Sequence, residues 1–218
     1  MIKAFEVTTM KSIRSDKLAE YAVFHGACQK ISELSPLISK LRRRKLRAVV
    51  EIGTMKGGTF WLWCQLATPD AVLVSIDLPG GAFGGGYSIK DMRRFRGYRV
   101  GRQSLYFIRR DSHEEKTRNL LRKKLDGRSI DFLMIDGDHR YRGVKRDFQL
   151  YAPLVRQNGL IALHDILPHP KVPSCKVDRL WREIRGRYSH QEFKDRHDDR
   201  GWGQWGGIGL LRYRQSKE

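Results

Sequence analysis

The sequence predicts an α/β protein in which a mostly parallel sheet carries helices on both of its faces. Five short apolar runs have the composition of strands that are buried on both faces. These runs lie at residues 48–53, 72–77, 105–108, 130–136 and 159–165. Helical spacing of apolar residues separates most of them, as at 59–66, 114–125 and 144–154. Strands that alternate with helices are typical of parallel sheets with right-handed crossovers.

The length of 218 residues is that of one domain. We expect a helical segment over residues 1–45, because apolar residues recur at helical spacing from residue 17 onward. The core of the domain follows over residues 46–213. A last apolar run at 207–213 has no helix after it, and we expect it to form an antiparallel strand at the edge of the sheet.

The composition is that of a soluble globular protein, with 40% hydrophobic and 31% charged residues. No apolar run approaches the roughly 20 residues of a membrane span, and the N-terminus lacks the apolar core of a signal peptide. We therefore expect no membrane span and a cytoplasmic location. The three cysteines, Cys28, Cys64 and Cys175, are scattered, which argues against a disulfide framework and against a cysteine-based zinc site.

The formal net charge is +19, from 43 Lys and Arg against 24 Asp and Glu. Such a field favours an anionic partner, either an acidic small molecule or a nucleic acid. The basic residues are dispersed along the chain, and no nucleic-acid-binding motif accompanies them. A nucleic-acid-binding or nucleic-acid-modifying protein is therefore an alternative that the sequence does not favour.

A glycine-rich turn follows the first predicted strand, in the stretch Glu51-Ile-Gly53-Thr54-Met-Lys-Gly57-Gly58. Glycines at the carboxyl end of a parallel strand let the backbone turn tightly and approach a ligand closely. The spacing is neither the dinucleotide pattern G-x-G-x-x-G nor a P-loop. An NAD-dependent oxidoreductase is thus a second, disfavoured alternative.

Polar residues also end the second and third predicted strands. Asp77 is placed to accept hydrogen bonds from both hydroxyls of an adenosine ribose. Asp111 and Ser112 follow the third strand, where a polar pair can address an adenine amino group. The order of these features along the chain favours an adenosine-containing ligand.

The fourth and fifth predicted strands end in Asp136-Gly-Asp138-His139 and in His164-Asp165. Because neighbouring strand ends meet at one edge of a sheet, we expect these side chains to converge. Carboxylates with a histidine can bind a divalent metal ion through oxygen and nitrogen ligands. The arginines nearby in sequence, Arg140 and Arg142, could neutralise the carboxylates instead.

Together these motifs resemble the class I S-adenosylmethionine-dependent methyltransferases. The stretches from Ile135 to Asp147 and from Leu154 to Asp165, with the closing Trp205-Gly-Gly-Ile-Gly-Leu-Leu-Arg212, resemble one branch of that superfamily. This branch contains the macrocin-type sugar O-methyltransferases and the cephalosporin hydroxylase-like proteins. The resemblance covers about residues 45–213 and implies a Rossmann-like, seven-stranded methyltransferase sheet with an antiparallel C-terminal strand.

The resemblance implies methyl transfer from S-adenosylmethionine to a hydroxyl of a small, sugar-like or anionic acceptor. A homo-oligomer is possible. In the family, the residues that match Glu51, Gly53, Asp77 and Asp111 hold the cofactor. We expect Thr54, Gly57, Gly58, Ser112 and Asp136 to complete the cofactor site.

The resemblance also implies a magnesium ion held by Asp136, Asp165 and a third acid, where this chain has His164. Histidine is a poor ligand for Mg²⁺ and suits Mn²⁺, Fe²⁺ or Zn²⁺ better, so a divalent ion such as Mg²⁺ or Mn²⁺ stays an expectation. By match to the family, Asp138 is the first candidate for the catalytic base, with His139 or His164 as alternatives.

Two further segments have no assigned role. Residues 80–86 contain five glycines directly after the predicted ribose carboxylate, which favours a mobile lid over the ligand. Trp202 and Trp205 either anchor the last strand in the core or form a stacking platform for the acceptor.

Overall fold

The computed structural model describes residues 12–195 and 201–214, and its centre is a seven-stranded sheet. The strand order is β3-β2-β1-β4-β5-β7-β6, in which the first five strands are parallel and the last two are joined by antiparallel pairings. The strands are β1 (Ala48–Ile52), β2 (Val72–Asp77), β3 (Ser104–Arg109), β4 (Ile130–Ile135), β5 (Val155–His164), β6 (Ser189–Phe193) and β7 (Ile208–Arg212). The predicted Rossmann-like architecture is confirmed.

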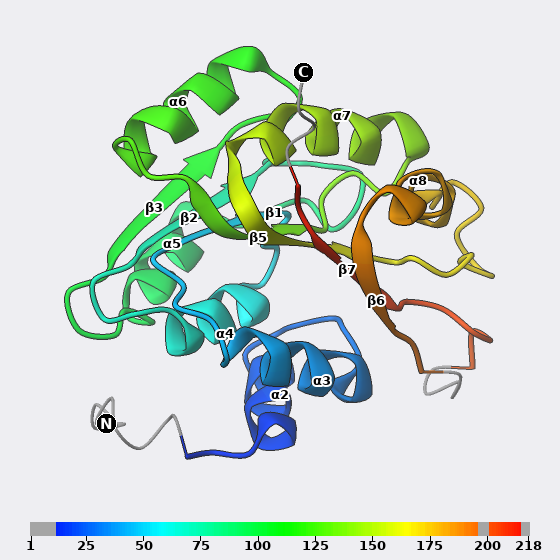
Figure 1. Ribbon diagram of the computed structural model, residues 1–218, viewed down its shortest axis with the longest axis horizontal. Coiled ribbons are helices and arrows are strands. Elements are labelled where there is room, and N and C mark those ends of the chain that lie inside the picture. Colours follow the sequence, from blue (N-terminus) through cyan, green and yellow to red (C-terminus); the bar gives the residue numbers. More distant parts are fainter. Residues whose placement is uncertain (1–11, 196–200, 215–218) are drawn as a thin grey trace.

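Helices cover both faces of the sheet (Figure 1). One face carries α2 (Ser15–Phe24), α3 (Ile31–Leu41), α4 (Gly58–Leu66) and α5 (Ile89–Arg96). The other face carries α6 (Glu115–Leu125), α7 (Tyr141–Tyr151) and α8 (Val177–Ile184). Short 3₁₀ turns at 152–154 and 185–187 follow α7 and α8. Among the described residues, no helix is both long and apolar enough to cross a membrane.

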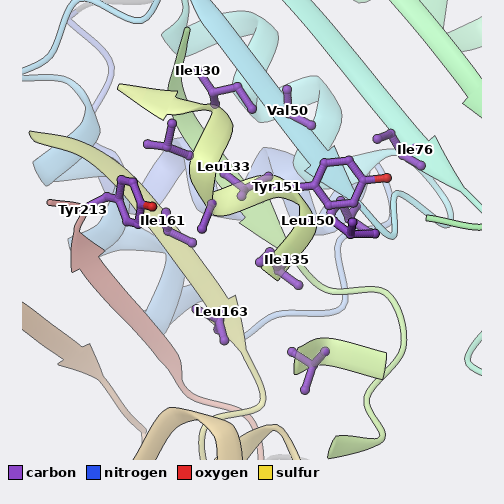
Figure 2. Close-up of a cluster of buried hydrophobic side chains, with 14 of the residues drawn as sticks. Val50, Ile76, Ile130, Leu133, Ile135, Leu150, Tyr151, Ile161, Leu163 and Tyr213 are labelled. Atoms are coloured by element: carbon purple, nitrogen blue, oxygen red, sulfur yellow. The ribbon is translucent and has the colours of Figure 1, made fainter. Parts of the chain in front are cut away.

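Alternate residues of the central strands feed two separate apolar layers, as the two-residue period of a strand requires. Val50 and Leu133 pack on the α6–α7–α8 face, beside Leu150 and Tyr151 of α7 (Figure 2). Their strand neighbours Val49 and Phe132 pack on the opposite face, with Trp63 of α4. Because both faces are covered, the central strands read as continuous apolar runs in the sequence.

The last apolar run of the sequence does not form the edge strand that we expected. β7 lies between β5 and β6, and β6 is at the edge. The residues of β7 from Ile208 to Leu211 are buried, as an interior strand requires. The five residues of β6, Ser-His-Gln-Glu-Phe, are exposed or only half-buried. They contain no apolar run, so sequence periodicity does not reveal this strand.

The strand order reverses between β1 and β4, and open α/β sheets bind their ligands in the crevice outside such a reversal. The two strand ends are in close contact there. Gly53 follows β1 with a φ of +83°, and a Cβ at this position would lie 2.0 Å from the carbonyl oxygen of Asp136. Only a glycine lets the backbone approach the Asp136 carbonyl this closely. Gly53 therefore allows the turn after β1 to pack against the loop after β4.

Candidate active site

A cavity of about 360 Å³ opens at the carboxyl ends of the parallel strands. Its wall combines the turns after β1, β2, β3, β4 and β5 with the connection between α2 and α3 and a segment before β7. The lining includes residues from 26–29, 52–55, 76–86, 110–113, 136–140, 164–175 and 202–205.

Asp77 braces the glycine turn after β1. Its Oδ2 accepts hydrogen bonds from the backbone N–H groups of Thr54, at 2.9 Å, and Met55, at 2.6 Å, and its Oδ1 accepts one from Leu78 N–H at 2.9 Å. Burial raises the pKa of Asp77, against the opposing effect of these hydrogen bonds. The carboxylate lines the cavity and keeps lone pairs for a ligand hydroxyl.

Three of the nine residues expected at the cofactor lie behind the cavity wall. Glu51 is 1% exposed, and its carboxylate accepts hydrogen bonds from Trp63 Nε1 at 2.6 Å and from Thr54 Oγ1 at 2.7 Å. Burial raises the pKa of Glu51 to about 7. Gly57 packs on Phe95, and Gly58 packs on the connection between α2 and α3. These residues support the turn from behind.

The turn after β3 brings Asp111 and Ser112 to the cavity, as the sequence predicts. Asp111 Oδ1 accepts a hydrogen bond from the backbone N–H of His113 at 2.9 Å. The carbonyl oxygen of Ser112 accepts one from the Tyr151 hydroxyl at 2.7 Å. Both contacts fix the turn, and the Ser112 side chain also interacts with the buried Asp147.

Two carboxylates and two imidazoles converge between the ends of β4 and β5. His139 Nδ1 lies 2.7 Å from Asp165 Oδ2, and His139 Nε2 lies 3.5 Å from Asp136 Oδ1. His164 Nδ1 lies 3.2 Å from the same Asp136 oxygen and 3.6 Å from the same Asp165 oxygen. The predicted convergence is present for these four residues, which we name the acid–imidazole cluster. Asp138, which we also expected in the cluster, pairs with Arg140 instead.

The cluster is neutralised by its own histidines. Burial opposes the charged imidazolium, but the neighbouring carboxylates outweigh it and raise the pKa of His139 to about 11 and that of His164 to about 9. Burial would raise the pKa of Asp165, and the two histidines nevertheless hold it far below the ordinary value. Arginine neutralises Asp138, which is one of the expected carboxylates, but it does not pair with the cluster itself. Arg140 pairs with Asp138 at 2.6 Å, and no described ion pair joins Arg142 to the cluster.

Asp138 lines the cavity beside the cluster. Its carboxylate accepts hydrogen bonds from Arg140 Nε, Arg140 Nη2 and the Arg140 backbone N–H at 2.6–3.1 Å. Burial alone would raise the pKa of Asp138, and the contacts with Arg140 lower it below the usual value. Asp138 is thus an ionised, well-oriented carboxylate and a weak base.

The donor atoms of Asp136, His164 and Asp165 fit a divalent cation, because they all lie within 4.8 Å of one another. One Asp165 oxygen, Oδ1, is buried and has no hydrogen-bond partner among the described residues. His139, Asp165 and Cys175 form a second group of this kind, which shares Asp165. A mixed set of carboxylate and imidazole donors suits Mn²⁺, Fe²⁺ or Zn²⁺ better than Mg²⁺.

Several cavity residues have no signal in the sequence. Gln29 comes from the connection between α2 and α3, and its Nε2 donates to Asp136 Oδ2 at 2.5 Å across 107 positions of the chain. Phe83 of the glycine loop stacks on His139, with ring centroids 4.8 Å apart. Such contacts arise from tertiary packing, and no local sequence pattern predicts them.

An aromatic group forms another part of the cavity wall. His169 lies with its ring centroid 5.7 Å from Trp202 and 6.2 Å from Trp205. Trp202 is 38% exposed, whereas Trp205 is buried. Both tryptophans line the cavity, and Trp205 is also packed into the protein, as an anchor of the last strand requires. A role in stacking on the acceptor stays a prediction.

The chain is similar to several known proteins. It is 31% identical over 148 residues to the uncharacterized protein R132 of Acanthamoeba polyphaga mimivirus, in an alignment over 66% of this chain and 64% of that protein. This chain thus spans less than two thirds of that relative's length.

Solved structures of low sequence identity share the fold. An O-methyltransferase from Bacillus cereus, in complex with S-adenosylhomocysteine (SAH), superposes with a TM-score of 0.59 at 14% identity, over 92% of this chain and 90% of that one. MycE, a methyltransferase of mycinamycin biosynthesis in complex with Mg and SAH, gives a TM-score of 0.56 at 13% identity, over 94% of this chain and 55% of that one.

A family model described as a methyltransferase domain matches residues 50–166, from β1 to just beyond the end of β5. This span is more than half of the chain and contains Asp77, Asp111, Asp138 and the whole acid–imidazole cluster. The chain belongs to this family of methyltransferases.

Proposed function

We propose that this protein transfers the methyl group of S-adenosylmethionine to a hydroxyl oxygen of a small, sugar-like or anionic acceptor. The observation that carries the proposal is one cavity that joins two kinds of wall. One wall consists of the strand-end turns around Gly53, Asp77 and Asp111. The other wall contains the acid–imidazole cluster and the aromatic side chains of His169, Trp202 and Trp205.

The cofactor would lie along the turns after β1, β2 and β3. The ribose hydroxyls would donate hydrogen bonds to Asp77, and Asp111 with Ser112 would address the adenine. Gly53 and Thr54 would let the backbone approach the cofactor, and Asp136 would lie near its amino acid part. Methyltransferases of similar fold have been solved in complex with SAH, which supports S-adenosylmethionine as the cofactor. Glu51, Gly57 and Gly58 would act from behind, by holding the turn.

The reaction is an in-line displacement at the methyl carbon. Bound S-adenosylmethionine would supply an electrophilic methyl group, so that an O–C bond would form as the S–C bond breaks and SAH would leave as the neutral thioether. The acceptor hydroxyl also loses a proton, which requires a base in the cavity. Holding the oxygen and the methyl group in line supplies a large share of the rate.

We propose Asp138 as that base, with the histidines as its partners in the site. Both ring nitrogens of His139 already face carboxylates, at 2.7 and 3.5 Å. His164 is 4% exposed, with Nδ1 directed at the cluster and Nε2 buried. Asp138 is an ionised carboxylate that lines the cavity and lies outside the acid–imidazole cluster. Because the pKa of Asp138 is lowered, its carboxylate is a weak proton acceptor. A second group that lowers the pKa of the acceptor hydroxyl would therefore help the proton transfer.

A divalent ion bound by Asp136, His164 and Asp165 would supply that aid, because a cation lowers the pKa of a hydroxyl that it contacts. The protein residues would orient the acceptor and exclude water. The acceptor itself would lie against His169, Trp202 and Trp205, since flat aromatic surfaces pack well against rings. The net charge of +19 would attract an anionic acceptor to the cavity.

The test is transfer of a radiolabelled methyl group from S-adenosylmethionine to a panel of hydroxyl compounds, namely glycosides, sugar phosphates, catechols and RNA. Each is assayed after exhaustive chelation and again after Mg²⁺, Mn²⁺ or Zn²⁺ is restored singly. We expect labelled glycoside or sugar phosphate and a higher rate with Mn²⁺ than in the chelated protein. Labelling of RNA alone would refute the proposed acceptor class, and full activity after chelation would refute the metal.

A further inference from the structure

Glu33, in the N-terminal helix α3, is a fully buried carboxylate that no part of the proposed reaction uses. Its Oε1 accepts hydrogen bonds from the backbone N–H groups of Gly207, at 2.9 Å, and Asp195, at 3.2 Å. Its Oε2 is buried and has no hydrogen-bond partner among the described residues. A buried carboxylate oxygen without a donor is unusual in a folded protein and requires an explanation.

His164 also has a buried polar atom that lacks a hydrogen-bond partner among the described residues, in this case a potential donor. Its Nδ1 faces Asp136 and Asp165, but its Nε2 is buried and also lacks a partner among residues 12–195 and 201–214. An imidazole nitrogen can donate a hydrogen bond, and a carboxylate oxygen can accept one. The two orphaned atoms are therefore a matched donor and acceptor.

The fold brings these two residues together. His164 ends β5 and pairs with Ile208 of β7, and Gly207, the residue before Ile208, donates to Glu33. The Glu33 carboxylate thus lies within one residue of the cross-strand partner of His164. Electrostatic attraction to Glu33 acts on His164, and attraction to His164 acts on Glu33. No hydrogen bond or ion pair joins the two side chains directly, so one buried water that accepts from Nε2 and donates to Oε2 would satisfy both atoms.

We propose that Glu33 is a positioning residue that keeps the proton of His164 on Nε2 and so directs the Nδ1 lone pair toward a divalent cation between Asp136 and Asp165. The inference rests on the metal site of the proposed function. In metal sites a ligating histidine usually donates its other ring N–H to a carboxylate or carbonyl, which fixes the tautomer and the ring orientation. Glu33, next to the cross-strand partner of His164, would be the carboxylate that accepts from Nε2–H through the bridging water.

Helix α3 would thus contribute a residue that supports the metal site. The helix packs on β6 and β7 and lies outside the matched methyltransferase region, yet the charge of Glu33 acts on His164 of the acid–imidazole cluster. An imidazole held in this way is a stronger nitrogen donor, which favours Mn²⁺ or Zn²⁺ over Mg²⁺ at the site.

The first experiment measures Mn²⁺ affinity of the full chain from the EPR signal of free Mn²⁺, for the unmodified protein and for Glu33→Gln. The amide can still accept from Gly207 N–H but cannot supply a second acceptor. We expect a loss of about 10- to 100-fold in Mn²⁺ affinity. The matched control is Ser32→Ala, which removes the neighbouring contact between α3 and Asp195 and should leave Mn²⁺ affinity unchanged.

A second measurement avoids the variant, in case Glu33→Gln does not fold. With ¹⁵N-labelled histidine and Zn²⁺ bound, the His164 ring should give the spectrum of an Nδ1-coordinated, Nε2-protonated imidazole. Unchanged Mn²⁺ affinity in folded Glu33→Gln, or coordination through Nε2, would overturn the inference. So would failure of the unmodified protein to bind Mn²⁺ or Zn²⁺. SAH binding, measured in parallel by calorimetry, reports separately on the proposed methyl transfer.

Discussion

His139 Nδ1 lies 2.7 Å from Asp165 Oδ2, across the gap between the ends of β4 and β5. The other nitrogen of the same ring faces Asp136 at 3.5 Å, so one imidazole spans both carboxylates of the acid–imidazole cluster. A protonated His139 therefore compensates charge at the place where a divalent cation would bind. A cation bound there would therefore compete with the proton of this ring.

The first prediction concerns the pH dependence of stability. The pKa of His164 is raised to about 9 and that of His139 to about 11, both above the ordinary value of about 6.5. The unfolded chain loses these protons first, so the native state binds more protons above about pH 6.5. The stabilisation is complete below that pH and is lost as the pH rises through the folded values.

Urea unfolding between about pH 6.5 and about pH 9 measures this effect. We expect the free energy of unfolding of the metal-free protein to fall steadily over that range, and to fall less steeply in His139→Gln. An equal slope for the two proteins would mean that His139 is not protonated in the native state.

The second prediction tests the close contact between the turn after β1 and the loop after β4. Gly53→Ala would place a Cβ 2.0 Å from the Asp136 carbonyl oxygen at a φ of +83°. We expect a loss of about 3 kcal/mol or more of unfolding free energy, because backbone must move on both sides. The matched control is Gly80→Ala, which has a similar φ of +76° but open space. Its cost should be about 1–2 kcal/mol, and equal costs would contradict the contact.

How much the sequence reveals of the fold depends on burial. β1, β2 and β4 are buried on both faces, and their apolar runs predict them. β6 is polar and exposed or half-buried, so no apolar run marks it in the sequence. Its place at the edge of the sheet follows from the structure, in which β7 is buried inside the sheet. β7 pairs antiparallel with both β5 and β6, so it lies inside the sheet although it is the last strand of the chain's described residues.

The candidate site divides in the same way. The convergence of Asp136, His164 and Asp165 follows from strand ends that meet at one edge, so the sequence predicts it. Glu51 breaks the simple rule, because its side chain is turned into the core by Trp63 and Thr54. Gln29 and Glu33 depend on how the N-terminal helices pack, and that packing has no local signature.

The third prediction concerns the glycine loop at 80–86. Four of its glycines have positive φ, and its contact with the rest of the site includes the Phe83 ring on His139. We expect the loop amides to exchange more slowly when SAH is bound, because the ligand would replace open space beside a loop with little packing of its own. Hydrogen exchange followed by mass spectrometry measures this, with NAD⁺ as the control ligand. Equal exchange with and without SAH would rule out a lid.

The fourth prediction tests Asp138 as the base. Asp138→Asn removes the proton acceptor and keeps the shape, so we expect methyl transfer to the best acceptor of the panel to fall by about 10²- to 10⁴-fold. SAH affinity should stay the same. Asp126→Asn, at an exposed position that ends α6, is the matched control and should keep full activity. Retention of most activity in Asp138→Asn would assign proton removal elsewhere.

The central claim, that the strand-end turns hold the adenosine of S-adenosylmethionine, is tested most directly by calorimetric titration with SAH. The unmodified protein should bind SAH and not NAD⁺. Asp77→Asn keeps an oxygen for the Thr54 and Met55 N–H groups but loses the charge that would hold the ribose hydroxyls. We therefore expect its SAH affinity to fall by about 10- to 100-fold, while Asp126→Asn binds normally. Equal SAH affinity in Asp77→Asn and the unmodified protein, or no binding of SAH to either, would contradict the account.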